Sequence, residues 1–302
     1  MLKITKEIKE ANLITHSGTF HPDDVFSTMF MSRIIENPVV CRTNTPEEAN
    51  QNAIIYDIGY GEFDHHGPNA RMRNEELKYC SFGLLWEKYG YEYLKQIDTE
   101  DIEMLFKKID EKLIMQIDGI DNGVFPKVEA PYKLTDLDHV IDSFNKAWNE
   151  EVDNDDNFIM AVNVASSIFD RYILRENAKI TAAKRVEKEI PNVKDNILFL
   201  NEYMPYSDAI FESTLPEAKD IKVVISPSNR GGYNIKPMTI SKDSKELVVN
   251  YPESIRGLHN EELVNACNIK GARFIHISGF MSAADDLESA YEMAKLLLEN
   301  KE

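Results

Sequence analysis

The chain has 302 residues, with 34 lysines and arginines against 52 aspartates and glutamates, which gives a formal charge of −18. Hydrophobic residues make up 43% of it, enough apolar material to exclude a chain that is disordered throughout. The acidity disfavours a broad footprint on duplex DNA or on an anionic membrane. Three widely spaced cysteines argue against a disulfide framework and, with no signal-peptide pattern or membrane-length apolar run, favour a cytoplasmic protein.

In the first half of the chain, short apolar segments typical of β-strands alternate with helical patterns. Strands are predicted at 13–15, 39–41 and 53–58, and helices at 25–35 and 82–89. Apolar residues at helical spacing continue from Ile102 to Ile117. This alternation predicts an α/β fold whose N-terminal sheet is mostly parallel and flanked by helices.

The second half begins with a polar, irregular stretch at 130–157, followed by a long helical pattern that ends near Pro191. Strands are then predicted at 197–200, 222–225, 247–251 and 273–277. Ser282 and Asp285 form a plausible capping box at the start of a last helix. We therefore predict two domains, a catalytic domain at 1–190 and a smaller C-terminal α/β domain, for substrate binding, at 191–302.

Four of the seven histidines lie within the first 66 residues, in two groups that follow predicted strands. These histidines are His16, His21, His65 and His66, and the carboxylates near them are Asp23, Asp24, Asp57 and Asp64. Because ligands bind at the carboxyl ends of strands in open α/β sheets, we expect the two groups to converge. A mixed set of imidazoles and carboxylates suits a divalent metal such as manganese, and a shared carboxylate could hold two ions about 3.5–4 Å apart.

Several other segments carry weaker signals. The segment from Asp118 to Gly123 ends a helical pattern and, taken alone, is more typical of an Asn-Gly turn than of a metal site. Arg256 precedes a glycine in a turn, where an arginine could clamp a phosphate. His276 ends a predicted strand and is either a core group or a substrate contact. The chain has no P-loop motif.

The ordered motifs resemble those of the DHH phosphoesterase superfamily, which includes RecJ-type exonucleases, manganese pyrophosphatases and short-RNA nucleases. The longer segments at 15–24 and 56–67 are similar to a narrower branch, the melanocyte proliferating gene protein family. The likeness continues at 81–86, 118–123, 144–149, 256–258 and 274–280, and so covers nearly the whole chain in order. Two departures are Val25, where many superfamily members have Asp, and 281–284, where family members tend to be glycine-rich.

The resemblance implies roles for particular residues. The implied metal ligands are His16, His21, Asp23, Asp57, His65 and Asp121. Asp121 is preferred to Asp118 because 121–125 is similar to the Asp-Thr-Gly-x-Phe motif of the short-RNA nucleases. The implied catalytic residues are His66, Asp57 and Asp64, with His66 assigned to the substrate phosphate. Arg256 and His276 would bind the far side of the substrate.

These motifs predict a metal-dependent phosphodiester hydrolase, with 3′→5′ exonuclease action on RNA or short oligonucleotides. Two Mn²⁺ or Mg²⁺ ions would activate a water, with Asp57 as the expected bridge between them. The expected partner is a short RNA or another small phosphodiester. Neither duplex DNA nor a membrane is expected, and a homo-oligomer is compatible with the sequence.

Two alternatives are open. The segment from His21 to Asp24 is similar to a His-Pro-Asp-Asp element of zinc-dependent sugar N-deacetylases, although Val25 replaces their usual Glu and the Asp-His-His motif would have no use there. The chain could also be a non-catalytic, regulatory metal-binding protein, but the completeness of its His and Asp groups argues against that.

Overall fold

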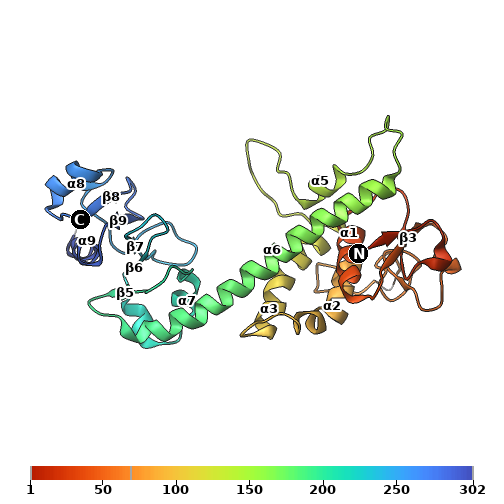
Figure 1. Ribbon diagram of the computed structural model, residues 1–302, viewed down its shortest axis with the longest axis horizontal. Coiled ribbons are helices and arrows are strands. Elements are labelled where there is room, and N and C mark those ends of the chain that lie inside the picture. Colours follow the sequence, from red (N-terminus) through yellow and green to blue (C-terminus); the bar gives the residue numbers. More distant parts are fainter. Residues whose placement is uncertain (1, 69, 301–302) are drawn as a thin grey trace. The chain divides into compact units, whose positions relative to one another are not determined.

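The computed structural model describes residues 2–68 and 70–300. The chain forms two compact units, Met1–Asn177 and Ala178–Glu302, and the division falls inside helix α6 (Asn154–Glu189) (Figure 1). This point lies upstream of the boundary predicted near Pro191. The reason is that Ala182, Val186 and Ile190 pack into a core of the second unit, so the last turns of α6 belong with that unit.

The sheet of the first unit is parallel, as predicted, and its described strands include one at 3–4 that was not predicted. They are β1 (Lys3–Ile4), β2 (Leu13–His16), β3 (Val39–Thr43) and β4 (Ile54–Ile55), in the order β1-β3-β2-β4. Strand β2 is central, and its Leu13 and Ile14 are fully buried. Strand β4 is shorter than the predicted 53–58, because the backbone turns at Asp57, which has a φ of 58°. His16 and Asp57 thus lie at neighbouring strand ends.

The helices of the first unit pack around α1. They are α1 (Pro22–Ile34), α2 (Ser81–Leu94), α3 (Ile102–Ile109), a π-helical turn (Asp110–Ile114), α4 (Met115–Asp121), α5 (Leu137–Asp142) and most of α6. Every residue of α1 from Pro22 to Met31 is buried, and Phe30 contacts the rings of Trp86 on α2 and Phe169 on α6. The aromatic core therefore fixes the helix that follows the first histidine motif.

The second unit contains a mixed sheet of five strands. They are β5 (Ile197–Phe199), β6 (Val223–Pro227), β7 (Tyr233–Pro237), β8 (Ala272–Ile275) and β9 (Ser282–Ala284), in the order β5-β6-β7-β9-β8. Only β5 and β6 pair in parallel among these described strands. Helices α7 (Ser207–Glu212), α8 (Asn260–Cys267) and α9 (Leu287–Glu299) complete the unit, and together the two units confirm the predicted α/β class.

Strand β7 of the second unit was not predicted, and two further details of this unit differ from the predictions. The segment 247–251 forms no strand in the described chain, only a single bridge between Leu247 and Thr239. Ser282 does not begin the last helix but lies in β9, and Asp286 caps α9 by accepting a hydrogen bond from the Ser289 amide at 2.8 Å. No helix of the described residues is both long and apolar enough to cross a bilayer.

Candidate metal centre

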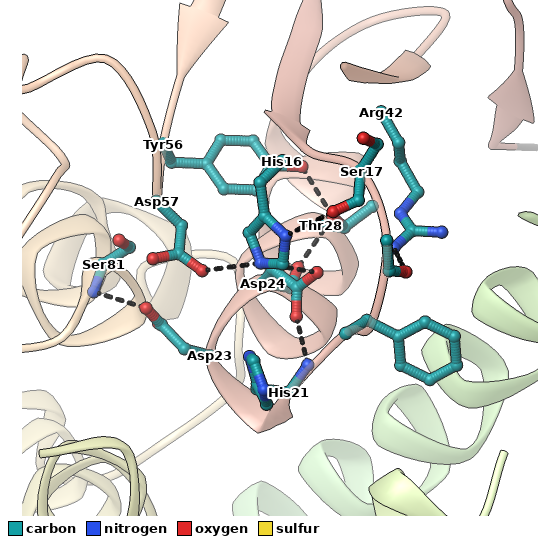
Figure 2. A network of polar contacts seen from close by, with 12 residues as sticks. His16, Ser17, His21, Asp23, Asp24, Thr28, Arg42, Tyr56, Asp57 and Ser81 are labelled. Carbon is teal, nitrogen blue, oxygen red and sulfur yellow. Dashed lines mark hydrogen bonds and ion pairs between the residues drawn. The ribbon is translucent and has the colours of Figure 1, made fainter. Parts of the chain in front are cut away.

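The predicted histidine and aspartate motifs meet at the carboxyl end of β2. Figure 2 shows the first motif there, with His16, Asp23 and Asp24 beside Asp57. Three groups of side chains there place potential ligand atoms within 4.8 Å of one another. The groups are His16 with Asp24 and Asp57, Asp23 with His65 and Asp121, and Asp57 with His65 and His66. Asp57 and His65 belong to two groups each, so the three form one continuous cluster.

His16 is held in a defined orientation. Its Nδ1 donates to the carbonyl oxygen of Ser17 at 3.0 Å, since a carbonyl can only accept. Its Nε2 lies 3.5 Å from Asp24 Oδ2 and 3.3 Å from Asp57 Oδ2. The hydrogen bond at one ring nitrogen leaves the other as the atom that faces the carboxylates, which is how metal-binding histidines are commonly oriented.

Asp23 and Asp24 lie in the first turn of α1, which Pro22 begins. Asp24 Oδ1 accepts a hydrogen bond from the His21 amide at 2.8 Å and so caps the helix. The two oxygens of Asp23 accept from the amides of Ser81 and Phe82, at 2.9 and 2.6 Å. Asp23 thereby connects α1 to the positive end of α2.

Asp57 lies between the two histidine motifs. Its backbone has a left-handed φ of 58°, and its amide donates to the Phe63 carbonyl at 3.0 Å. Its carboxylate oxygens face different imidazoles: Oδ2 is 3.3 Å from His16 Nε2, and Oδ1 is 3.3 Å from His65 Nε2. This is the arrangement expected of a carboxylate shared by two cations.

The Asp-His-His motif contributes one buried and one half-exposed imidazole. His65 Nε2 lies 3.0 Å from Asp121 Oδ2, whereas the ring of His66 is 55% exposed. Asp64 accepts from the Tyr60 amide at 2.6 Å and from the amide and Nδ1 of His66 at 3.0 and 2.8 Å. Within the described chain, Asp64 is in none of the three ligand groups, so its contacts order the loop instead.

The geometry favours Asp121 over Asp118 as the fourth-motif ligand. Asp118 is fully buried and accepts from the Cys80 amide at 2.8 Å and from Arg73 Nε at 2.5 Å. Its oxygens are therefore used within the protein. Asp121, at the end of α4, joins Asp23 and His65 in one of the ligand groups.

The cluster concentrates negative charge in a buried space. Burial raises the pKa of Asp24 to about 7, although His16 counteracts it. Burial, together with Asp57 and Asp121, also raises the pKa of Asp23 well above its usual range. Burial opposes ionisation of Asp57 too, but hydrogen bonds with His16 and His65 prevail and lower its pKa to about 2.

The histidines carry the compensating positive charge in the metal-free protein. Burial lowers the pKa of His65, but its contacts with Asp121 and Asp57 outweigh that effect and raise the pKa to about 11. The pKa of His16 is likewise raised to about 9, by Asp57 and Asp24 against burial. The carboxylates of the cluster, on Asp23, Asp24, Asp57 and Asp121, thus need cationic partners.

The residues present fit a pair of divalent cations. Buried Asp24 Oδ2, Asp57 Oδ1 and Asp121 Oδ2 have no hydrogen-bond partner of good geometry among the described residues. Buried carboxylate oxygens that accept no hydrogen bond are costly. These three face the imidazoles of His16 or His65 at 3.0 to 3.5 Å, and a bound cation would compensate their charge. Asp24 was not in the predicted ligand set. The signal that could have included it was the second aspartate of the His-Pro-Asp-Asp segment.

His21 is the predicted ligand that the geometry leaves aside. Its ring centroid lies 5.9 Å from that of His16, and within the described residues it belongs to no ligand group. It lines a hollow of about 470 Å³ beside the cluster. The hollow is also lined by His16, Thr19, Asp57, Ile58, Gly59, Tyr60, Asp64, His66 and Asp121.

The first histidine loop is held by residues that sequence reasoning did not select. Asn145 Oδ1 accepts from the Phe20 amide at 3.0 Å, and its Nδ2 donates to the Phe20 carbonyl at 2.9 Å. Arg42 Nη2 and Asn154 Nδ2 both donate to the Gly18 carbonyl, at 2.7 and 2.9 Å. These contacts fix the backbone between His16 and His21.

Arg256 and His276 lie in the second unit, on adjoining segments. Arg256 Nη2 is 3.1 Å from Glu253 Oε1. His276 Nδ1 is 2.8 Å from Ser278 Oγ, and its ring meets that of Phe280 edge-on. Their assignment to the substrate stays a prediction.

Residues 12–298 match a protein-family model, MYG1_exonuc, which is described as Uncharacterised protein family (UPF0160). The MYG1 protein of Dictyostelium discoideum is 27% identical over 318 residues, covering 95% of this chain and 96% of its own. The MYG1 exonuclease of Homo sapiens is 26% identical over 319 residues, covering 94% of this chain and 85% of its own.

Among solved structures, the pGpG-specific phosphodiesterase PggH from Vibrio cholerae aligns with 95% of this chain and 97% of its own. It is 15% identical, with a TM-score of 0.33. The family model spans nearly the whole chain, including both histidine motifs and the Asp118–Asp121 segment. The chain therefore belongs to the MYG1 (UPF0160) family, the melanocyte proliferating gene protein family that its motifs predicted.

Proposed function

We propose that this protein is a metal-dependent phosphodiester hydrolase that removes nucleotides from the 3′ end of RNA or short oligonucleotides. The observation that carries the proposal is the position of Asp57, whose two carboxylate oxygens each lie 3.3 Å from a different histidine. Relatives in Homo sapiens and Rattus norvegicus bear the name MYG1 exonuclease, which supports a nuclease function for this protein.

The chain offers ligands for two cations, and a mixed nitrogen and oxygen set suits Mn²⁺ and accommodates Mg²⁺. His16 and Asp24 would hold one cation, and Asp23, His65 and Asp121 the other, with Asp57 common to both. When bound, two such cations lower the pKa of a water and neutralise the charge that develops on phosphorus.

His66 and Asp64 supply the remaining chemistry from the protein itself. An ionised carboxylate only accepts hydrogen bonds, so Asp64 Oδ1 orients the ring by accepting from His66 Nδ1 at 2.8 Å. In its imidazolium form, in which both ring nitrogens carry a proton, the half-exposed ring of His66, which lines the hollow, would then donate from Nε2 to a phosphoryl oxygen. Asp64 acts in this scheme as a positioning residue and does not touch the substrate.

The net charge of −18 restricts the substrate. A cation-loaded site converts a local cluster of carboxylates into a receptor for phosphate. The rest of the acidic surface repels a long polyanion, which favours a short single strand or a small phosphodiester. Hydrolysis should therefore depend only weakly on salt, in contrast to the steep dependence of proteins that neutralise many phosphates.

The test is a substrate panel with wild-type protein and the Asp57→Asn variant. Asparagine tolerates the left-handed backbone at this position, so the fold should be kept. Wild-type protein should cleave a 5′-labelled oligoribonucleotide from its 3′ end and bis-p-nitrophenyl phosphate with Mn²⁺ or Mg²⁺, and EDTA should abolish both reactions. The variant should bind less metal and lose turnover.

Undiminished metal-dependent cleavage by folded Asp57→Asn protein would contradict the assignment. Release of acetate from N-acetyl sugars, without action on any phosphodiester, would favour the N-deacetylase alternative. Metal binding without turnover on any substrate would favour the regulatory one.

A further inference from the structure

Tyr60 combines strong exposure with a place beside the candidate metal centre. Its side chain is 78% exposed, although large aromatic residues usually bury their rings. It lines the hollow that His16, His66 and Asp121 also line. An exposed aromatic ring at the rim of a cation and phosphate site is a feature that the mechanism above does not use.

The backbone of Tyr60 is held in an unfavourable conformation. Its φ is 56°, in the left-handed region that bulky residues rarely adopt. Gly59 and Gly61, on either side, show that the loop tolerates glycine, which would adopt this φ without strain. Such strain persists where the surroundings enforce it, and it gathers at functional sites.

One buried carboxylate enforces this conformation and also orients His66. Asp64 Oδ2 accepts from the Tyr60 amide at 2.6 Å, and Asp64 Oδ1 accepts from His66 Nδ1 at 2.8 Å. The Asp64 side chain is only 1% exposed. The backbone that carries the aromatic ring and the imidazole assigned to the phosphate are therefore fixed relative to each other through Asp64.

Tyr60 also lines a second, neighbouring hollow of about 450 Å³. Pro46, Ile55 and Ile58 contribute apolar side chains to it. On one side the tyrosine thus borders the histidines and carboxylates of the candidate metal centre, and on the other it borders a hollow that combines these apolar side chains with Asn44 and Glu47 at its edge. A nucleotide has the same two-part character, with a charged phosphate and a flat, weakly polar base.

We propose that Tyr60 positions the substrate by stacking its ring on the base of the nucleotide whose phosphate lies at the candidate metal centre. The inference rests on the proposed function and names its substrate class: phosphodiesters that carry a nucleobase, with little discrimination among bases. Stacking on an aromatic ring is tolerant of sequence because every base has a π-face.

The experiment compares Tyr60→Leu with Tyr60→Phe. Leucine has a side chain that is strained at a positive φ as tyrosine is, so this variant removes the ring without relieving the backbone strain. Phenylalanine keeps the ring and removes only the hydroxyl. Tyr132→Leu is the matched control, because Tyr132 is 70% exposed and is not among the described residues that line either hollow. Metal content and thermal unfolding check that each variant is folded. Should Tyr60→Leu fail to fold, Tyr60→Gly removes the ring without backbone strain.

Two readouts separate positioning from a structural effect. The first is KM and kcat on an adenylyl dinucleotide and on its abasic counterpart, both with Mn²⁺. The second is the equilibrium affinity of the Mn²⁺-loaded protein for AMP and for inorganic phosphate, measured by calorimetry. Tyr60→Leu should raise KM for the dinucleotide and Kd for AMP by about 5- to 100-fold, the range that base–aromatic stacking contributes. It should leave the abasic substrate and inorganic phosphate unchanged, and Tyr60→Phe should match the wild type.

Wild-type values for Tyr60→Leu on the dinucleotide and on AMP would overturn the proposal while the hydrolase function stands. A loss in Tyr60→Phe as large as that in Tyr60→Leu would also overturn it, because the hydroxyl would then be the important group. Failure of the wild type to hydrolyse any phosphodiester would refute the proposed function instead, and the AMP and phosphate affinities would still decide the role of Tyr60.

Discussion

Arg73 and Asp118 form a buried ion pair, in which Arg73 Nε lies 2.5 Å from Asp118 Oδ2. The same guanidinium also pairs with Asp110 through two hydrogen bonds of 2.5 and 3.0 Å. Asp118 accepts a further bond from the Cys80 amide. This network fastens the segment before α2 to the π-helical turn and to the middle of α4. It also gives two aspartates three positions apart different surroundings, because Asp118 is paired within the fold whereas Asp121 faces the candidate metal centre.

Exchanging each aspartate for asparagine should separate the two roles. Asp118→Asn removes one partner of a buried ion pair, and we expect metal-free stability to fall by about 3 kcal/mol, the lower end of the usual cost because Arg73 keeps Asp110. Its metal content should be unchanged. Asp121→Asn should lose metal and keep most of its stability. Denaturant unfolding and metal analysis of both variants test this, and metal loss confined to Asp118→Asn would reverse the assignment.

The same carboxylate predicts an unusual response at Gly83 on α2. A Cβ atom at Gly83 would lie 2.3 Å from Asp118 Oδ1, the atom that accepts from the Cys80 amide. Alanine normally stabilises a helix interior relative to glycine by about 1 kcal/mol. Here Asp118 would have to move and release a buried hydrogen bond to a charged group, so we expect Gly83→Ala to lower stability by about 1–3 kcal/mol.

The control for this substitution is Lys88→Ala on the same helix, which removes surface contacts with Glu62 and Phe63 and should lower stability by no more than about 1 kcal/mol. Chemical denaturation of the metal-free proteins gives both values. A Gly83→Ala protein as stable as the wild type would mean that Asp118 can shift freely, contrary to the network described above.

The hydrogen bonds of Asn145 lead us to expect that metal binding depends on this residue, although it is far in sequence from the histidine motifs. Its side-chain amide makes two hydrogen bonds with the backbone of Phe20, 125 residues away, and two longer ones of 3.3 Å with Asp142 and Asn154. Asn145→Ala should loosen the loop between His16 and His21 and weaken Mn²⁺ binding by about tenfold, as is common for groups that orient metal ligands. Calorimetric titration with Mn²⁺ measures the change.

Asn163→Ala is the matched control, since Asn163 lies on the exposed side of α6. Equal Mn²⁺ affinities for the wild type and Asn145→Ala would show that the loop keeps its shape without this contact.

These contacts show how far the sequence could predict the site. His16 and Asp57 were predictable because each follows an apolar run that forms a strand, and strand ends in a parallel sheet share an edge. The left-handed turn at Asp57 was not predictable, because the apolar run to Ile58 reads as a continuous strand. The segment 144–149, which contains Asn145, was noted for its likeness to the family, but the contact of Asn145 with Phe20 was not predictable, because a clamp on a backbone 125 residues away leaves no local pattern.

The strands of the second unit were also only partly predictable from the sequence. Strand β6 was predicted from its own apolar residues, whereas β7 and β9 were missed. Strand β9 is only Ser282–Ala284, and its small residues are buried by pairing with both β7 and β8. Its strand character comes from partners distant in sequence, and local propensity gives no sign of it.

The buried charges of the metal centre predict how the metal-free protein responds to pH. The folded-state pKa of Asp24 is raised to about 7, mainly by burial, so folding favours its protonated form. An acid with a raised pKa takes up protons on folding, and stability falls as pH rises from its unfolded pKa to its folded one. His16, raised to about 9 by its aspartate partners against burial, contributes stability that is present below its unfolded pKa and lost towards pH 9. Both effects have the same sign.

Metal-free protein should therefore lose a few kcal/mol of stability between about pH 5 and pH 8. Asp24→Asn should reduce this slope, because the amide removes the buried charge while its carbonyl oxygen can still accept from the His21 amide. Mn²⁺ should restore the stability at pH 8, since binding to the folded state alone adds about 2.7 kcal/mol at a hundred times Kd. Urea unfolding at pH 5 and pH 8, with EDTA or Mn²⁺, measures all three effects. A metal-free stability that rises towards pH 8 would show that the carboxylates of the cluster do not repel one another as their burial implies.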